Sequence, residues 1–171
     1  MKDKCVEELL QRVRKIHSDC YQLISRTLGK DLPVAGNIGV FCQSEEEYEK
    51  FEEVRKGLIK PSGNSKRKYF KLKEPVVIEA GSDTPKAIYR YLYVRKPETT
   101  PFGSYLGDID FVMEPGEYKI FRDSVVAGKV RGTKLFDRPG WDTVQITDPE
   151  ISSVAFVSTK EFAEKVRVRS N

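Results

Sequence analysis

The chain has 171 residues, of which 39% are hydrophobic and 33% charged, and its formal net charge is +4. This length and composition predict one domain of the soluble globular class and exclude a disordered chain. No apolar run approaches the roughly 18–20 residues that cross a bilayer, and acidic residues follow Met1 too soon for a secretory signal. We therefore expect a cytoplasmic protein whose charge is too mild for an obligatory nucleic-acid binder.

Three cysteines and a single histidine limit the chemistry of the chain. An odd number of cysteines without a C-x-x-C pair favours small buried thiols over a disulfide framework. His17 lies at the rim of an amphipathic stripe, where a structural role is the expectation. One histidine argues against an all-protein zinc site, so any metal would be a hard cation such as Mg²⁺ or Mn²⁺ held by carboxylates.

Apolar residues at three- and four-residue spacing predict a long helix from about Lys4 to Leu28, ended by Gly29. A short strand from Asn37 to Cys42 follows. Ser44 then opens a second helix, in which Glu47 completes a capping box.

Three further strands follow the second helix. The first is broken, comprising Lys66 to Leu72 and Val76 to Glu79, and the others run from Ala87 to Val94 and from Tyr105 to Met113. Together with the strand at 37–42, they predict a four-stranded mixed sheet with a helix on one face.

The pattern weakens after Met113. Pro115 could open a helix through about Val126, and a strand from Glu117 to Phe121 is the alternative. Short strands are predicted around Phe136 and at 144–146 and 154–157, and Ser158 with Glu161 forms a capping box for a last helix through Val166.

The predicted fold class is α+β in a single domain, 1–171. A curved mixed sheet of βαβββ type carries the N-terminal helix on its convex face. The parts are an N-terminal helix at 1–30, the βαβββ module at 36–113 and a degenerate second half at 114–171.

Alternation along the strands predicts a polar, aromatic face that would bind a ligand. Its members are Asn37, Tyr89, Tyr91, Tyr93, Asp108 and Asp110. Asp108 and Asp110 are two residues apart on one strand, so both carboxylates point the same way and could hold Mg²⁺ or share a proton. The alternative is that the aspartates face solvent and that the tyrosines reflect ordinary strand propensity.

Three stretches resemble a known family. Tyr69–Val76 (YFKLKEPV) and Tyr105–Val112 match two of its strand passages, and Trp141–Val166 is similar to its last strand pair and closing helix. The chain thereby resembles the vicinal oxygen chelate superfamily (glyoxalase/bleomycin-resistance fold), and within it the YecM-like branch.

The resemblance implies a metal site on the concave sheet face, whose usual ligands are His and Glu. Its ligand positions fall on Asn37, Tyr93 and Asp108, and a further Glu position falls on Asp110. An amide and a phenol are poor transition-metal ligands, so the resemblance implies a member that kept the pocket and lost the metal. Many members of the superfamily pair two modules, within one chain or between two chains, so the resemblance also allows a homodimer.

Basic residues interleaved with aromatics at 60–73 suggest a second surface. Lys66, Arg67, Lys68 and Lys71 could follow a phosphate backbone, although lysines also protect the edge of a sheet.

The first hypothesis is therefore a protein that binds a small polar ligand, cationic or hydroxyl-rich, without a transition metal. The alternatives are a divalent-metal lyase, isomerase or dioxygenase that uses Asp108 and Asp110, and a nucleic-acid-binding module that uses 60–73.

Overall fold

The computed structural model describes residues 2–61, 68–136 and 139–169, which form an α+β fold with a long N-terminal helix, as predicted. The described helices are α1 (Lys2–Leu28), α2 (Glu45–Leu58), α3 (Pro115–Val126) and α4 (Lys160–Arg169). The described strands are β1 (Val34–Phe41), β2 (Phe70–Ile78), β3 (Ala87–Arg95), β4 (Gly107–Val112), β5 (Thr133–Leu135), β6 (Val144–Ile146) and β7 (Val154–Ser158). In this part of the chain, no helix is both long and apolar enough to cross a membrane.

All seven described strands form one mixed sheet in the order β2-β3-β1-β4-β7-β6-β5. β7 pairs in parallel with β4, so the second half of the chain extends the sheet that the first half begins. The strand expected around Phe136 lies just before it, at Thr133–Leu135. Pro115–Val126 is a helix, and the alternative of a strand at 117–121 is wrong.

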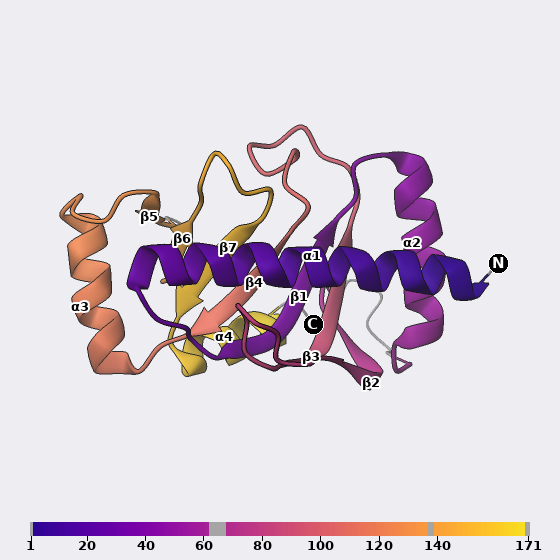
Figure 1. Ribbon diagram of the computed structural model, residues 1–171, viewed down its shortest axis with the longest axis horizontal. Coiled ribbons are helices and arrows are strands. Elements are labelled where there is room, and N and C mark those ends of the chain that lie inside the picture. Colours follow the sequence, from indigo (N-terminus) through magenta and orange to yellow (C-terminus); the bar gives the residue numbers. More distant parts are fainter. Residues whose placement is uncertain (1, 62–67, 137–138, 170–171) are drawn as a thin grey trace.

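α1 lies across one face of the sheet and covers its central strands (Figure 1). We call this the α1 face. Residues of α1 at helical spacing, among them Leu9, Val13 and Ile16, are fully buried there against the sheet. Gly29 ends the helix at a φ of +68°, a conformation that favours glycine. We call the opposite face the cavity face; α4 lies on that side and contacts β1 and β4.

Two irregularities in strand pairing change which residues share a face. Along β1 and β4 the register shifts between Val34 and Ile38, where Gly36 has a φ of +109°. Along β2 and β3, Lys71 pairs with Tyr91 but Val76 pairs with Tyr89, so five steps on one strand match two on the other. The regular alternation of side chains between the two faces of the sheet is therefore interrupted in this part of β3.

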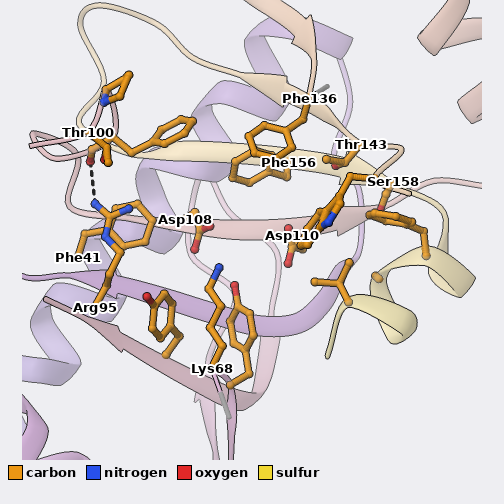
Figure 2. Close-up of a pocket in the computed structure, with 18 of the residues that line it drawn as sticks. Phe41, Lys68, Arg95, Thr100, Asp108, Asp110, Phe136, Thr143, Phe156 and Ser158 are labelled. Atoms are coloured by element: carbon orange, nitrogen blue, oxygen red, sulfur yellow. Dashed lines mark hydrogen bonds between the residues drawn. The ribbon is translucent and has the colours of Figure 1, made fainter. Parts of the chain in front are cut away.

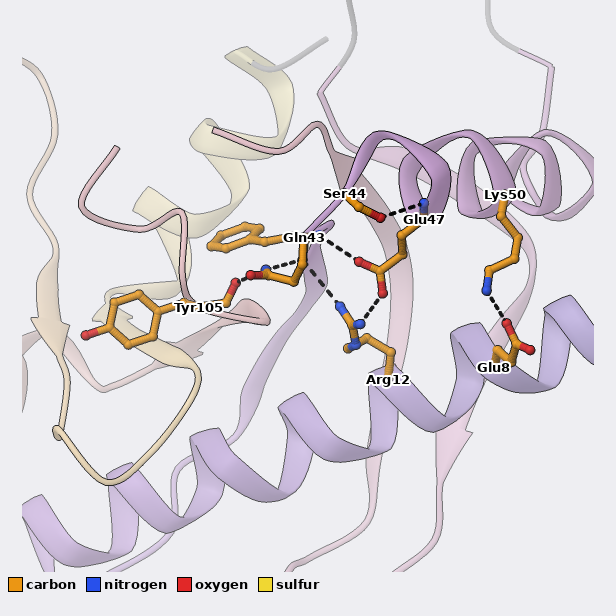
Figure 3. A network of polar contacts seen from close by, with 8 residues as sticks. Glu8, Arg12, Gln43, Ser44, Glu47, Lys50 and Tyr105 are labelled. Carbon is orange, nitrogen blue, oxygen red and sulfur yellow. Dashed lines mark hydrogen bonds and ion pairs between the residues drawn. The ribbon is translucent and has the colours of Figure 1, made fainter. Parts of the chain in front are cut away.

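A group of polar contacts fastens α2 and the end of β1 to α1 (Figure 3). Arg12 pairs with Glu47 and also donates to the Phe41 carbonyl at 3.3 Å. The Gln43 side-chain amide donates to the same carbonyl and to the Tyr105 carbonyl, both at 2.9 Å. These contacts hold the end of β1 against the loop that precedes β4.

The caps of α2 and α4 differ in detail from the prediction. Ser44 accepts from the Glu47 backbone N–H, as expected, but the Glu47 carboxylate accepts from the backbone of Gln43. At α4 the capping hydroxyl belongs to Thr159, which accepts from the Phe162 N–H at 3.3 Å, so the prediction of Ser158 as the cap is wrong. Ser158 is instead the last residue of β7.

Gly107 provides a test of the packing between α1 and the sheet. A Cβ atom at Gly107 would overlap the Gly39 carbonyl oxygen and crowd the Ile16 side chain. We expect Gly107→Ala to lower the free energy of unfolding by about 1–3 kcal/mol, measured by urea denaturation. Gly57→Ala is the matched control, because Gly57 lies in α2 with open space around it, and there alanine should stabilise by up to about 1 kcal/mol. Equal stability of the two variants would contradict this account of the packing.

Candidate functional site

A cavity of about 740 Å³ lies on the cavity face. Its floor comes from β1, β3, β4 and β7, and its walls come from the loop after β3, from β5 and from α4. Figure 2 shows Asp108 and Asp110 on the floor, with aromatic rings above them. The aromatic lining residues are Phe41, Tyr69, Tyr93, Phe102, Phe136, Trp141, Phe156 and Phe162.

One wall of the cavity is a chain of aromatic rings from the second half of the sequence. Phe136 contacts Phe156 at 5.9 Å and Trp141 at 6.1 Å between ring centroids, and Trp141 contacts Phe162 at 5.8 Å. Interplanar angles of 64–85° make these edge-to-face contacts, which hold the rings in defined positions. Trp141 is the single tryptophan of the chain, so its fluorescence reports on this wall alone.

Asp108 is the buried acid of the cavity floor. β4 alternates, so Ile109 packs on the α1 face and Asp108 lies on the cavity face, opposite Gly39 of β1. A side chain at Gly39 would overlap the Asp108 carboxylate, so only glycine leaves room there. Asp108 is 8% exposed, and its Oδ1 has no hydrogen-bond partner among the described residues.

Burial, with a smaller contribution from the negative charge of Asp110, raises the pKa of Asp108 to about 7. The charges of Lys68 and Arg95 and a hydrogen bond from the Gly39 backbone oppose that rise. Near neutral pH, Asp108 is therefore present both as a carboxylate and as a carboxylic acid. It can accept a hydrogen bond in either form and can donate one when it carries the proton.

Asn37 is buried beside Asp110 on the cavity face. Its side chain is 1% exposed, and its Nδ2 donates to the Asp110 Oδ2. Asn37 also hydrogen-bonds Tyr69, which partly offsets the rise that burial causes in the pKa of this phenol. Its role in the structure is thus to orient two cavity residues.

Two cations face the same hollow as the acids. Arg95, at the end of β3, is 9% exposed, and its guanidinium stacks on the Phe41 ring at 3.6 Å. Its Nη2 donates to the Phe102 carbonyl at 3.1 Å. Lys68 is exposed at the rim, with its Nζ 4.9 Å from the centre of the Tyr93 ring.

The structure brings together three of the six predicted face residues as cavity lining: Tyr93, Asp108 and Asp110. Asn37 is buried and bonds to Asp110, and Tyr91 is half-buried outside the lining of the cavity. The placement of Tyr89 on this face is wrong. It is fully buried on the α1 face, with its hydroxyl 2.7 Å from the His17 Nδ1, because the pairing irregularity of β2 and β3 breaks the alternation.

The predicted basic segment does not form one surface among the described residues. Lys66 and Arg67 lie outside the described residues, Lys68 lines the cavity, and Lys71 is exposed on β2.

The donor set does not fit the His and Glu metal site that the family resemblance implies. The described residues contain no group of three or more His, Cys, Asp or Glu side chains that could hold a metal ion. Asp108 and Asp110 are the two carboxylates of the floor, and Asn37 turns its amide nitrogen toward Asp110.

Several lining residues were missed by the reasoning from sequence. Arg95 could have been found, because it continues the spacing of Tyr91 and Tyr93 by one more step. The aromatic wall could not, because its rings come from separate strands, a turn and α4, and no local pattern links them.

The fold and this cavity define a small α+β protein with an aromatic-walled, carboxylate-floored site. No family model matches the chain, and no curated protein matches it. It is similar to a solved structure described as "Structural Genomics, Protein EC4020", with 15% identity and a TM-score of 0.46 over 90% of this chain and 92% of that chain.

The raised pKa of Asp108 makes stability depend on pH. Below about pH 4 the acid is protonated in both the folded and the unfolded state. As the pH rises to about 7, the unfolded state loses this proton while the folded state keeps it, so folded stability falls and then stays level. We expect Asp108→Asn to be more stable than wild type at pH 8, by at most about 4 kcal/mol, with the difference vanishing near pH 4.

Urea denaturation at pH 4, 6 and 8 measures this difference. Asp83→Asn is the control, because Asp83 lies exposed in the turn before β3 and should change stability little at any of the three pH values. A lower stability of Asp108→Asn at pH 8 would show that Lys68 and Arg95 outweigh the burial of the carboxylate.

Proposed function

We propose that the protein binds a small organic molecule in this cavity, with an apolar ring against the aromatic wall and a hydroxyl or ammonium group at Asp108. The observation that carries the proposal is Asp108, an acid that is only 8% exposed and that lines the floor of a 740 Å³ cavity.

An unpartnered buried carboxylate oxygen destabilises a fold by about 1–3 kcal/mol or more. A ligand that donates a hydrogen bond to the Asp108 carboxylate from the cavity would offset part of the cost of burying this acid. Asp110 does not take that place, because it accepts from Asn37 and its charge raises the pKa of Asp108. The cavity also has the volume that is typical of small-molecule sites, and it combines aromatic walls with polar groups that converge on one hollow.

We also propose, from the sequence resemblance, that the chain is a member of the glyoxalase/bleomycin-resistance superfamily that kept its ligand cavity and lost the metal. The support is that the family's metal positions coincide with Asn37, Tyr93 and Asp108, which here hold an amide, a phenol and a carboxylate at one site.

Trp141 allows the proposal to be tested without a known ligand. Toluene, benzyl alcohol and benzylamine share one ring and differ in the donor group, and each can be titrated against the fluorescence of Trp141. We expect the two donor-bearing probes to bind about 5- to 30-fold more tightly than toluene, because they satisfy Asp108. In Asp108→Leu, which keeps the branched outline of the side chain and removes both oxygens, this preference should disappear while toluene still binds.

Asp83→Asn, exposed and remote in sequence from the floor, should retain the preference. The absence of a Trp141 response to all three probes at millimolar concentration, or an unchanged preference in Asp108→Leu, would refute the proposal. Parallel titrations with Mg²⁺ and Mn²⁺ test the alternative hypothesis of a metal-dependent enzyme. That hypothesis requires stoichiometric metal binding that Asp108→Leu abolishes.

A further inference from the structure

The cavity carries both signs of charge in equal number. Its cationic lining residues are Lys68, Arg95 and Lys134, and its acidic lining residues are Glu98, Asp108 and Asp110. A ligand with a cation alone would satisfy the acids but would meet repulsion from Arg95 and Lys68. This balance favours a ligand that itself carries two kinds of polar group.

Arg95 is the buried cation of the lining, and its hydrogen bonding is incomplete. It is nine-tenths buried, and its Nε has no partner among the described residues. Its Nη1 lies 4.0 Å from Glu98, the outer limit of an ion pair, and the Glu98 side chain is 42% exposed. The other contacts are the Phe102 carbonyl and the face of the Phe41 ring. A guanidinium has five N–H donors that suit a carboxylate, so Arg95 retains the capacity to bind one.

The strand register sets the order of the groups along the floor. Gly39 pairs with Tyr93 on one side and with Asp108 on the other, and Phe41 pairs with Arg95. Standard strand spacing then separates the Cα atoms of Arg95 and Asp108 by about 12 Å, and side chains that lean toward each other shorten the distance between their charged groups. Figure 2 shows the two side chains facing the same hollow.

Asp110 and the aromatic wall continue this order in the direction away from Arg95. Asp110 lies two residues beyond Asp108 on β4, and its neighbour on β7 is Phe156. Phe156 contacts Phe136, which belongs to the chain of rings that includes Trp141. From one end to the other, the cavity therefore offers a cation, an acid and an aromatic wall.

We propose that the ligand is a small ring-bearing carboxylic acid with an ammonium or hydroxyl group between its ring and its carboxylate, a class that includes aromatic amino acids and hydroxy acids. This inference rests on the proposed function and adds Arg95 as the residue that recognises the anion. The carboxylate pairs with Arg95, the middle donor group bonds to Asp108, and the ring packs beside Trp141.

Isothermal titration calorimetry of the whole chain tests the three contacts separately. Phenylalanine and 3-amino-4-phenylbutanoate carry all three groups at two spacings. Phenethylamine lacks the carboxylate, phenylalaninamide neutralises it, and 3-phenylpropionate lacks the donor. We expect at least one of the two complete probes to bind tenfold or more tightly than each of these incomplete probes.

Arg95→Gln should remove the advantage of the carboxylate without weakening the binding of phenethylamine, whose ammonium group no longer meets the charge of Arg95. Arg90→Gln is the matched control, because Arg90 is an exposed arginine on the same strand and should behave as wild type. Arg95→Lys keeps the charge, loses the paired N–H donors and should retain part of the advantage. A thermal melt of each variant shows whether it is folded. The comparison of phenylalanine with phenylalaninamide tests the role of the carboxylate in the wild-type chain and needs no variant.

The outcomes distinguish this inference from the proposed function. If donor-bearing probes bind through Asp108 but the carboxylate brings no advantage in wild type, the inference is overturned and the proposed function stands. An advantage that survives unchanged in a folded Arg95→Gln variant would also overturn it. Failure of every aromatic probe to bind would overturn both.

Discussion

The alternation of β4 between two faces of the sheet is the constraint on which the rest of the site depends. Ile109 and Phe111 are fully buried on the α1 face, where Phe111 meets the ring of Tyr21 at 5.1 Å. Because successive residues of a strand point to opposite faces, the packing of these two residues under α1 directs Asp108 and Asp110 to the other side. The hydrophobic contact of α1 with the sheet thus positions two carboxylates that hydrophobicity alone would leave in water.

The floor of the cavity shows what this placement requires of its neighbours. Gly39 leaves space for the Asp108 carboxylate, and the amide of Asn37 donates a hydrogen bond to Asp110. Polar groups at such depth destabilise a fold unless they are paired. The two acids therefore differ in their surroundings: Asn37 pairs with Asp110, whereas the Oδ1 of Asp108 has no partner among the described residues.

The cavity also shows how distant parts of the chain combine in one site. Its acids and Arg95 come from the first half, and the wall of Phe136, Trp141 and Phe162 comes from the second. The parallel pairing of β7 with β4 brings the two halves together, since it places Phe156 beside Asp110. The ligand class that we propose, with a ring at one end and polar groups at the other, would contact both halves of the chain.

The sequence by itself determined the local elements. Apolar spacing predicted α1, Ser44 and Glu47 predicted the start of α2, and alternation predicted β4 and the shared direction of Asp108 and Asp110. These features depend on residues within a few positions of one another, so a local pattern is enough to reveal them. Only the tertiary structure decided the face of Tyr89, the support from Asn37 and the aromatic wall. These depend on strand register and on contacts between residues far apart in the chain, and no periodicity in a single segment records them.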